Sequence, residues 1–442
     1  MGKDKILELL KEIVPSDCPS EIVAVQWNQA LCRFSSNRIH QNSLELQTRV
    51  WLKVMHPQGI GVVQLNSLAP DDLRWGIQRA RDYAINLNLP GPAFPLTGTT
   101  SFREVNLWDQ ETADASPHES SERVAQMIKW AEKAGLDLAG ALETKSRELA
   151  IVNSEGLAAY SKDTTAIYHT VAYQQRDNAT GYGYTCSRAL SGLEMLTATM
   201  EAASKCQASI RPKAIPPGLY TVILEPAAVA GLLYFLARLG FNGLAWHEGR
   251  SPFPELGKTY LSEEVTIWDD GLDPRGLAMP FDFQGTPKRR LNLVKEGSVL
   301  NVAMGNLLAA RSGRPATGHG TLPGDSQGPV PQHIFMEPGN AMLEDMITTT
   351  KNGILITRFH FLNLLDPCQA IITGTTRDGT LLVENGFLRG ATLSLRMVQS
   401  LAKAFKQIEM VGDETRLFAL PWGSIRVPAL KIRDFTITGS GH

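Results

Sequence analysis

Several features that would assign a protein to a functional class at once are scarce in this sequence. Its 442 residues include five cysteines, which are widely scattered and form no Cys-x-x-Cys pair. Neither a disulfide framework nor a zinc knuckle is therefore indicated. The 43 basic and 45 acidic residues nearly balance, so the chain lacks the charge excess typical of binding to nucleic acid or anionic membranes. The longest apolar run, residues 226–237, is shorter than the roughly 20 residues of a membrane-spanning helix.

What the sequence does contain is typical of a soluble protein of the cytoplasm. Hydrophobic residues make up 43% of the chain and charged residues 20%, as in ordinary globular domains. Charges interrupt every apolar run in residues 1–10, which indicates an amphipathic helix rather than a signal peptide. We therefore expect a cytoplasmic protein that has neither a membrane nor a nucleic acid as its partner.

The length of the chain predicts two domains of roughly 200 residues each. The clearest boundary is Arg211–Gly218, where three prolines and a glycine fall within eight residues. We expect an α+β protein. Its N-terminal α/β domain covers residues 1–215, with subregions of about 1–110 and 111–215, and its mostly antiparallel β domain with a few helices covers 216–442.

Local patterns predict individual elements. Alternating apolar residues from Leu44 to Val54 indicate a half-buried strand. Ser116-Pro117-His118-Glu119 combines a capping Ser, a first-turn Pro and a Glu three residues after the Ser, so a helix should begin there and end near Ala134. Further expected elements are helices near 71–85, 192–206 and 392–408, a proline-rich loop at 89–95 and a hairpin about 153–156.

The most informative segment runs from a strand end at Tyr220–Leu224 into a helix beginning at Pro226. This helix is apolar nearly all round and should be buried in the core of the second domain. Other short blocks accompany it in a characteristic order: Arg33–Gln41, Asn153–Gly156, Glu248–Ser251, Pro280–Pro287, Gly374–Gly379 and Val383–Gly386. Together with the helix, these blocks resemble the TldD/TldE (PmbA) family across the whole chain.

The resemblance implies a zinc site that this chain lacks. D-type members of the family bind zinc through His-Glu-x-x-x-His on this helix and through a Cys in a Cys-Gly step near the C-terminus. Aligned to that pattern, the ligand and base positions carry Tyr234, Phe235, Leu239 and Trp422. None of these side chains offers the imidazole, thiolate or carboxylate that binds zinc or activates a zinc-bound water. Without ligands to converge on a metal, the helix is also expected to be regular.

By the same resemblance, we expect an E-type subunit that is inactive alone and has no cofactor of its own. A TldD-like subunit would complete a heterodimer and supply zinc and the catalytic base. The substrate would be an unfolded peptide, which would bind by addition of a β-strand; Ile354–Asn363 is one candidate edge strand. A different hypothesis is a non-proteolytic homodimer that acts as a peptide-binding scaffold.

A third hypothesis is an independent hydrolase with a relocated metal site, whose candidate ligands are His247, Glu248, His319, His333 and His360. His247-Glu248 begins like a zincin motif, but Pro252 denies the helix that this motif requires. We therefore expect both residues in a loop that follows the core helix. The other three histidines lie on separate segments, where a histidine is usually solvated or hydrogen-bonded structure. A further candidate is Cys368 as a nucleophile with His360 as its base. A cysteine is more commonly a buried, inert residue.

Overall fold

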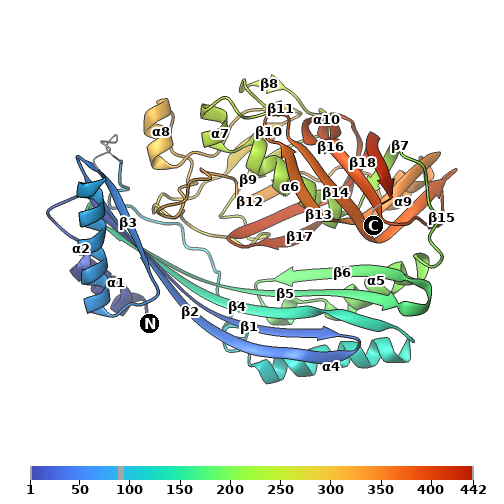
Figure 1. The fold of residues 1–442 in the computed structure, drawn as a ribbon, viewed down its shortest axis with the longest axis horizontal. Helices are drawn as coiled ribbons and strands as arrows, with labels where there is room; N and C mark the ends of the chain where they lie inside the picture. The colour runs from blue at the N-terminus through green and yellow to red at the C-terminus, as the bar shows by residue number, and fades with distance from the viewer. Residues whose placement is uncertain (1, 88–93, 441–442) are drawn as a thin grey trace.

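The computed structural model describes residues 2–87 and 94–440. In this part of the chain the strands form a six-stranded sheet, in the order β3-β2-β1-β4-β5-β6, and a twelve-stranded sheet built from β7 to β18. Figure 1 shows the first sheet as one long curved layer, with the second half of the chain along its inner face. The predicted α+β fold, an α/β part followed by a mostly antiparallel β part, is confirmed.

Neighbouring strands of the first sheet are antiparallel, and several of them are unusually long. The strands are β1 (Ser20–Ser35), β2 (Arg38–His56), β3 (Gly59–Leu65), β4 (Asp137–Asn153), β5 (Ala158–Gln174) and β6 (Ala179–Ser187). The turn at Asn153–Gly156 joins β4 to β5, as the sequence predicts. These strands give the chain a long inner surface that faces the second sheet.

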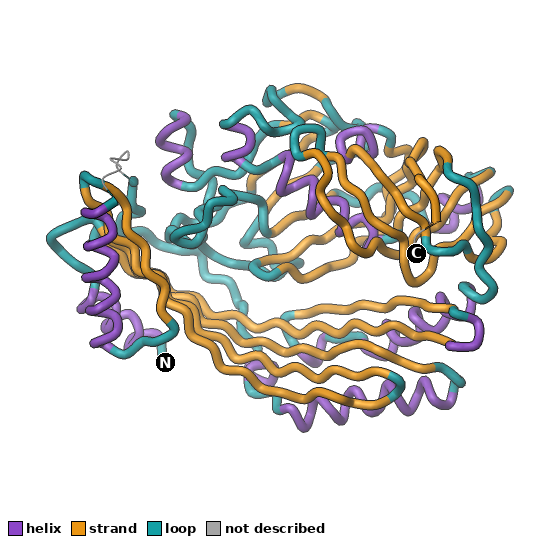
Figure 2. Tube along the Cα trace, in the orientation of Figure 1, coloured by secondary structure: helices purple, strands orange, loops and turns teal. Residues whose placement is uncertain are grey.

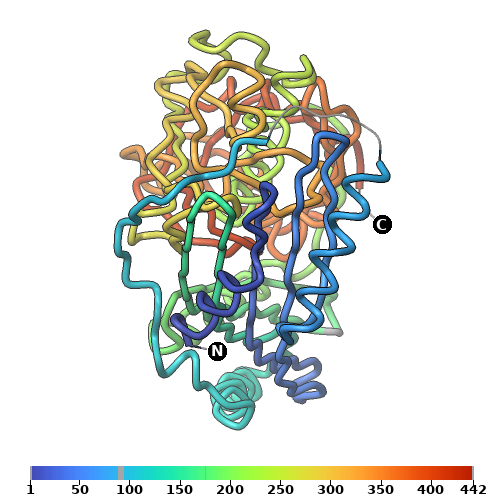
Figure 3. Tube along the Cα trace, turned by 90° about the vertical axis from the view of Figure 1, so that its left-hand side faces the viewer, coloured from blue at the N-terminus to red at the C-terminus, as the bar shows by residue number. Residues whose placement is uncertain are grey.

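Helices cover the outer face of this sheet at its two ends (Figures 2 and 3). At one end α1 (Lys3–Ile13) and α2 (Pro70–Asn86) pack on the sheet, and at the other end lie α4 (Pro117–Lys133) and α5 (Met195–Ala208), with the short α3 (Gln110–Ala113) nearby. The sequence signals for α4 are confirmed, because Ser116 and Glu119 form a complete capping box. Gly183 explains how closely α5 approaches β6: a Cβ atom there would lie 1.8 Å from the carbonyl oxygen of Ala198.

The second sheet is mainly antiparallel, with parallel pairs between β12 and β18 and between β7 and β13. Its strands are β7 (Gly218–Leu224), β8 (Lys258–Thr259), β9 (Ile267–Asp269), β10 (Leu291–Lys295), β11 (Ser298–Val299), β12 (His333–Met336), β13 (Asn352–Asp366), β14 (Ile371–Glu384), β15 (Phe387–Ala391), β16 (Leu395–Ser400), β17 (Ile408–Leu420) and β18 (Gly423–Ser440). Its helices are α6 (Pro226–Gly240), α7 (Gly243–His247), α8 (Asn306–Ser312), α9 (Leu343–Thr348) and α10 (Leu401–Lys406).

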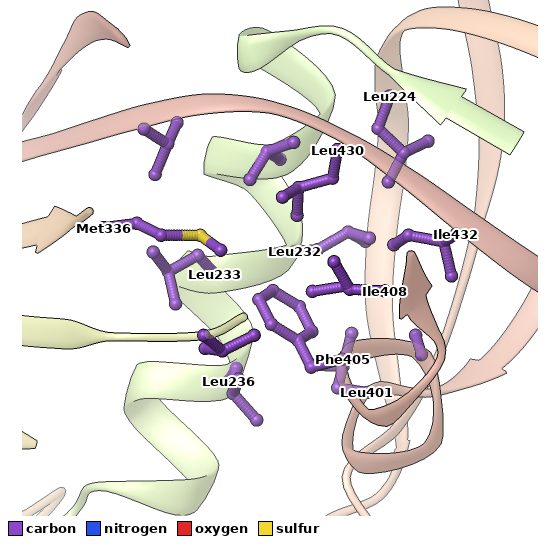
Figure 4. Packing of buried hydrophobic residues seen from close by; sticks show 14 of the residues in the cluster. Leu224, Leu232, Leu233, Leu236, Met336, Leu401, Phe405, Ile408, Leu430 and Ile432 are labelled. Atoms are coloured by element: carbon purple, nitrogen blue, oxygen red, sulfur yellow. The ribbon is translucent and has the colours of Figure 1, made fainter. Parts of the chain in front are cut away.

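Helix α6 lies at the centre of the largest hydrophobic core (Figure 4). Leu232, Leu233 and Leu236 are fully buried on it. They belong to the same cluster as Leu430 of β18 and Phe405 of α10. The prediction of a buried helix at this point is confirmed. Within residues 2–87 and 94–440, no helix is both long and apolar enough to cross a lipid bilayer.

The two halves meet through apolar and polar contacts. Met279, Phe281 and Phe283 pack against the inner face of the first sheet in one cluster with Val23 and Trp51. Nearer the other end of the molecule, the backbone N–H of Ala419 donates to the Tyr184 hydroxyl at 2.9 Å, and Arg416 pairs with Glu201 at 2.7 Å. The second half therefore contacts the inner face of the first sheet and, through Arg416, also helix α5.

Three sequence predictions are wrong in their details. Leu44 and Leu46 are 51% and 75% exposed, because the helices packed on the outer face lie over the ends of the sheet. The helix expected near 392–408 is divided into strand β16 and the short α10, since residues 395–400 pair with β14 and β18. The region beyond Val265 also contains α8 and α9, whereas the sequence predicts one helix there, near 392–408.

The candidate peptide-binding edge is wrong in part. Residues 354–356 of β13 are internal to the sheet, because they pair with β14 on one side and with β7 on the other. From Arg358 to Asn363, the described pairing partners of β13 lie on β14. Of the proline-rich loop predicted at 89–95, residues 89–93 lie outside the described part of the chain.

Candidate functional site

The positions of α6 that the family resemblance assigns to zinc ligands and the base form a mainly aromatic surface. The helix runs unbroken from Pro226 to Gly240. The rings of Tyr234 and Phe235 meet edge to face, with centroids 5.8 Å apart, and the Arg238 guanidinium lies 5.4 Å from the centroid of the Tyr234 ring. Leu239 packs partly buried against the same core. These contacts are those of a packed helix surface.

Trp422 occupies the tight turn between β17 and β18. Its ring meets Phe283 edge to face at 4.8 Å, and the Arg147 guanidinium lies 4.7 Å from its centroid. Gly423 is required next to it, because a Cβ atom there would lie 1.9 Å from the carbonyl oxygen of Gln332. The turn is thus fixed between the two halves of the molecule.

A cavity of about 300 Å³ lies between α6 and this turn. Tyr234 and Phe235 line it from the helix, and Leu420 and Pro421 line it from the β17 end. Leu362 of β13 also reaches it, where the bulge between His360 and Asn363 interrupts the pairing with β14. The walls are apolar except for the tyrosine hydroxyl.

The histidines of the second sheet do not gather at this cavity. His319 and His333 lie in a separate, fully buried polar cluster around Asp269 of β9. The Nε2 atom of His319 lies 3.0 Å from Asp269 Oδ1, and the Nζ atom of Lys288 lies 3.8 Å from the same oxygen. Asp269 Oδ2 accepts the backbone N–H groups of Gln332 and His333, both at 2.7 Å. Asp269 therefore joins two segments of the core.

The electrostatics of this cluster keep both histidines neutral. Burial and the charge of Lys288 lower the pKa of His319, and they lower the pKa of His333 to about 3. Burial alone would raise the pKa of Asp269, but Lys288 and His319 hold it well below its ordinary value. The charged pair is thus Asp269 with Lys288, flanked by two neutral imidazoles.

The chain of contacts Thr317–His319–Asp269 has the order of a catalytic triad. Thr317 Oγ1 lies 2.8 Å from His319 Nδ1. The same hydroxyl also bonds the backbone N–H and carbonyl of Met304, and Thr317 is only 6% exposed. A nucleophile needs a reactive atom that a substrate can reach, so this arrangement is structural.

The other candidate residues lie apart from each other. His247 ends the short helix α7 and is exposed, and Glu248 after it pairs with Arg250, so the expectation that both lie in a loop is wrong for His247. His360 lies beside Arg377 near the bulge of β13. Cys368 is exposed in a turn, contrary to the expected buried thiol. Among the described residues, no three His, Cys, Asp or Glu side chains are arranged to hold a metal ion.

Comparison with known protein families shows which family the chain belongs to. Residues 217–439 match the family described as the PmbA/TldA metallopeptidase C-terminal domain. The chain belongs to the PmbA/TldD metallopeptidase family. The matched region includes α6, the turn at Trp422 and the cluster around Asp269.

Individual relatives agree with this membership of the PmbA/TldD family. A metalloprotease TldD homolog from Buchnera aphidicola subsp. Acyrthosiphon pisum is 26% identical over 239 residues, which cover 50% of this chain and 49% of the relative. Metalloprotease PmbA from Escherichia coli O157:H7 is 23% identical over 395 residues, which cover 86% of this chain and 84% of the relative. The chain thus spans about half the length of the TldD homologs it matches.

Solved structures share the fold of this PmbA/TldD family member. The crystal structure of TldE from Thermococcus kodakarensis has a TM-score of 0.87 at 20% identity, with 99% of each chain covered. A putative modulator of a DNA gyrase from Thermotoga maritima has a TM-score of 0.85 at 19% identity, again with 99% of each chain covered. At these identities the likeness establishes the fold alone.

A zinc ion does not fit the aromatic cavity beside α6 in this member of the PmbA/TldD family. The nine described residues that line the cavity offer only the phenol of Tyr234 as a polar side chain. Zinc sites need several nitrogen, sulfur or carboxylate ligands. Trp422, which the family resemblance places at the third ligand position, directs its ring at Phe283 and Arg147.

Sequence reasoning missed a second cavity, which lies between the first sheet and the β17–β18 turn. Glu143, Lys145 and Arg147 line it from β4. The available signal was their spacing, since residues two apart on a strand point to one face. Three charged residues of β4 therefore lie on the face that meets the other half of the chain.

Proposed function

We propose that this chain is a TldE-like subunit of a heterodimeric zinc metalloprotease that cleaves unfolded peptides or processes peptide precursors. A TldD-like partner would supply the zinc and the catalytic base. The observation that carries the proposal is the aromatic and aliphatic packing of Tyr234, Phe235 and Trp422 at the positions that the resemblance assigns to zinc ligands and the base. The chain belongs to a metallopeptidase family, yet it has this apolar surface at the site. Together these two facts favour a subunit that works with a second one.

The geometry of α6 supports the same proposal. Ligands five residues apart on a regular α-helix point about 140° away from each other, so a metal-binding relative must distort the helix to bring them together. Helix α6 has no such break between Pro226 and Gly240. Its contribution is to the wall of a cavity, which suits the binding of an apolar part of a peptide.

The experiment measures zinc content and cleavage of a chemically unfolded, fluorescently labelled protein. The chain alone, a TldD-like protein from the same organism alone, and their mixture are compared. We expect the chain alone to be zinc-free and inactive and the mixture to cleave. A partner variant in which the zinc-binding histidines are replaced by alanine should abolish cleavage by the mixture.

Conservative variants test whether the polar atoms of Tyr234 and Trp422 take part in cleavage. Tyr234→Phe and Trp422→Phe keep the aromatic packing, and the mixture should cleave as fast with them as with the unmodified chain. Stoichiometric zinc and cleavage by the lone chain would instead establish an independent hydrolase. An inactive mixture, with the chain a homodimer that binds peptide, would replace the proposal by the scaffold hypothesis.

A further inference from the structure

The second cavity encloses about 220 Å³ between the inner face of β4 and β5 and the β17–β18 turn. Its lining includes five charged side chains: Glu143, Lys145, Arg147, Asp163 and Arg188. Leu420 and Pro421 line this cavity and also line the aromatic cavity beside α6. The two cavities therefore lie on either side of one short segment of chain.

The charges in this cavity are only partly paired. Arg147 Nε lies 2.9 Å from Asp163 Oδ2, and its Nη1 donates to the carbonyl of Pro421 at 3.3 Å. Arg188 donates to two backbone carbonyls, those of Asn106 and Gly276. These carbonyls are neutral, so they orient the guanidinium without cancelling its charge. Three cations face two carboxylates, which leaves one positive charge in excess.

Lys145 is attracted by the carboxylates of Glu143 and Asp163, and its ammonium also lies near an aromatic ring. The contact that the structure gives its ammonium is with the ring of Trp27, at 5.4 Å from the centroid, and Arg49 lies 5.1 Å from the same ring. Burial lowers the pKa of Lys145, and the neighbouring Arg147 lowers it further. Burial raises the pKa of Glu143. The shift of Lys145 shows that water solvates its ammonium poorly, a condition that an anionic ligand beside it relieves.

We propose that this cavity binds the carboxylate at the C-terminus of an extended peptide, with Lys145 and Arg188 as its cationic partners. A space of this size admits one terminal residue. The peptide would then cross the Leu420–Pro421 segment and place an earlier side chain in the aromatic cavity. Because it takes a peptide as the ligand, the inference rests on the proposed function.

The test measures peptide binding to the chain alone by isothermal titration calorimetry at pH 7. The probe is an N-acetylated tetra-alanine with a free C-terminal carboxylate, and its matched control is the C-terminal amide. We expect the free acid to bind at least about tenfold more tightly, because charge-assisted hydrogen bonds to the carboxylate are lost in the amide. Equal binding of the two peptides, or no binding of either, overturns the proposal.

A carboxylate also occurs on aspartate side chains, so a third probe separates the two sources. This probe is an amidated peptide of the same length with one internal Asp. It should bind as weakly as the plain amide. Binding equal to that of the free acid would overturn the assignment to a peptide terminus and place a side-chain carboxylate in the cavity.

Variants then test the residues. Lys145→Met should reduce the preference for the free acid about tenfold. Lys162→Met is the matched control, because Lys162 is exposed on β5 and its ammonium lies 4.1 Å from the centroid of the Trp108 ring. The control should keep the preference; loss of the preference in both variants, or in neither, contradicts the assignment of Lys145.

A second variant covers the case in which Lys145→Met fails to fold, which thermal unfolding would reveal. Glu143→Gln removes a competing negative charge and should tighten binding of the free acid; weaker binding overturns the proposal. The peptide measurements use the chain alone, whereas the proposed function is tested by reconstitution with a partner. The two hypotheses can therefore fail independently.

Discussion

The aromatic cavity beside α6 and the polar cluster around Asp269 combine opposite properties. The cavity is open to a ligand, but its walls are formed by side chains such as Phe235 and Leu420. The cluster holds an aspartate, a lysine and two histidines, but all four are almost completely buried. Reactive side chains and an accessible space thus occur in different places in the same half of the chain. Residue types alone therefore do not make a catalytic site.

The largest expected effect comes from removing the centre of the polar cluster. Asp269→Ala should lower the free energy of unfolding by about 3–5 kcal/mol, because it leaves the buried Lys288 ammonium without its carboxylate. Two backbone N–H groups, those of Gln332 and His333, also lose their acceptor. Chemical denaturation measures the change. Asp71→Ala is the control, since that side chain is 98% exposed, and it should leave stability nearly unchanged.

Acid should weaken the same cluster before Asp269 itself titrates. The folded protein keeps His333 neutral, with a pKa of about 3, whereas the unfolded chain protonates it near pH 6.5. The unfolded state therefore binds more protons below pH 6.5, and stability falls as the pH falls. His333 alone should contribute about 2–3 kcal/mol of loss between pH 6.5 and 4.5.

His333→Gln isolates this contribution. The difference in unfolding free energy between the variant and the wild type should shrink as the pH falls from 6.5 to 4.5. A difference that stays constant across this range would show that His333 is protonated in the folded state. The polar cluster would then not be closed in the way that distinguishes it from the open aromatic cavity.

A smaller effect is expected at the turn that closes the aromatic cavity. Trp422→Ala should cost about 2 kcal/mol of stability, since the ring is half-buried and contacts both Phe283 and Arg147. Thermal unfolding measures the loss. Trp422→Phe should recover part of it by keeping an edge of aromatic ring against Phe283. An unchanged midpoint for Trp422→Ala would mean that the turn holds its shape without this contact.

The smallest effect is expected at α6, on the wall of the aromatic cavity. The double variant Tyr234→His with Leu239→His should bind zinc no more tightly than Tyr234→His alone, as measured by competition with a chromogenic chelator. The two imidazoles would point about 140° apart on the regular helix. Clearly tighter binding by the double variant would show that α6 can distort to form a site.

Patterns with a local cause were predictable from the sequence. The capping box at Ser116 and Glu119 depends on side chains three residues apart, and the structure contains both of its hydrogen bonds. The burial of α6 follows from apolar residues on all its faces. The resemblance to a metallopeptidase family also needed only the order of short blocks, and the family match over residues 217–439 agrees with it.

Predictions that depend on distant neighbours were less successful. Leu44 and Leu52 alternate in the same pattern on β2, yet Leu52 is buried in the core with α2 and Leu44 is 51% exposed. The difference lies in where α2 packs, which the strand pattern does not contain. Ile354–Asn363 has the composition of an edge strand, but residues 354–356 are internal, because β7 from an earlier part of the chain pairs with them.

The sequence by itself determined that α6 and the β17–β18 turn carry Tyr234, Phe235, Leu239 and Trp422, none of which is a zinc ligand of the usual kind, since side-chain chemistry is fixed by residue identity. Only the tertiary structure decided that His319 and His333 meet Asp269 in the core while His360 lies elsewhere. It also decided that Lys145 and Arg188 line one cavity. Residues so far apart in the chain come together through sheet pairing and packing between the two halves. Such contacts depend on the whole fold, and no local pattern encodes them.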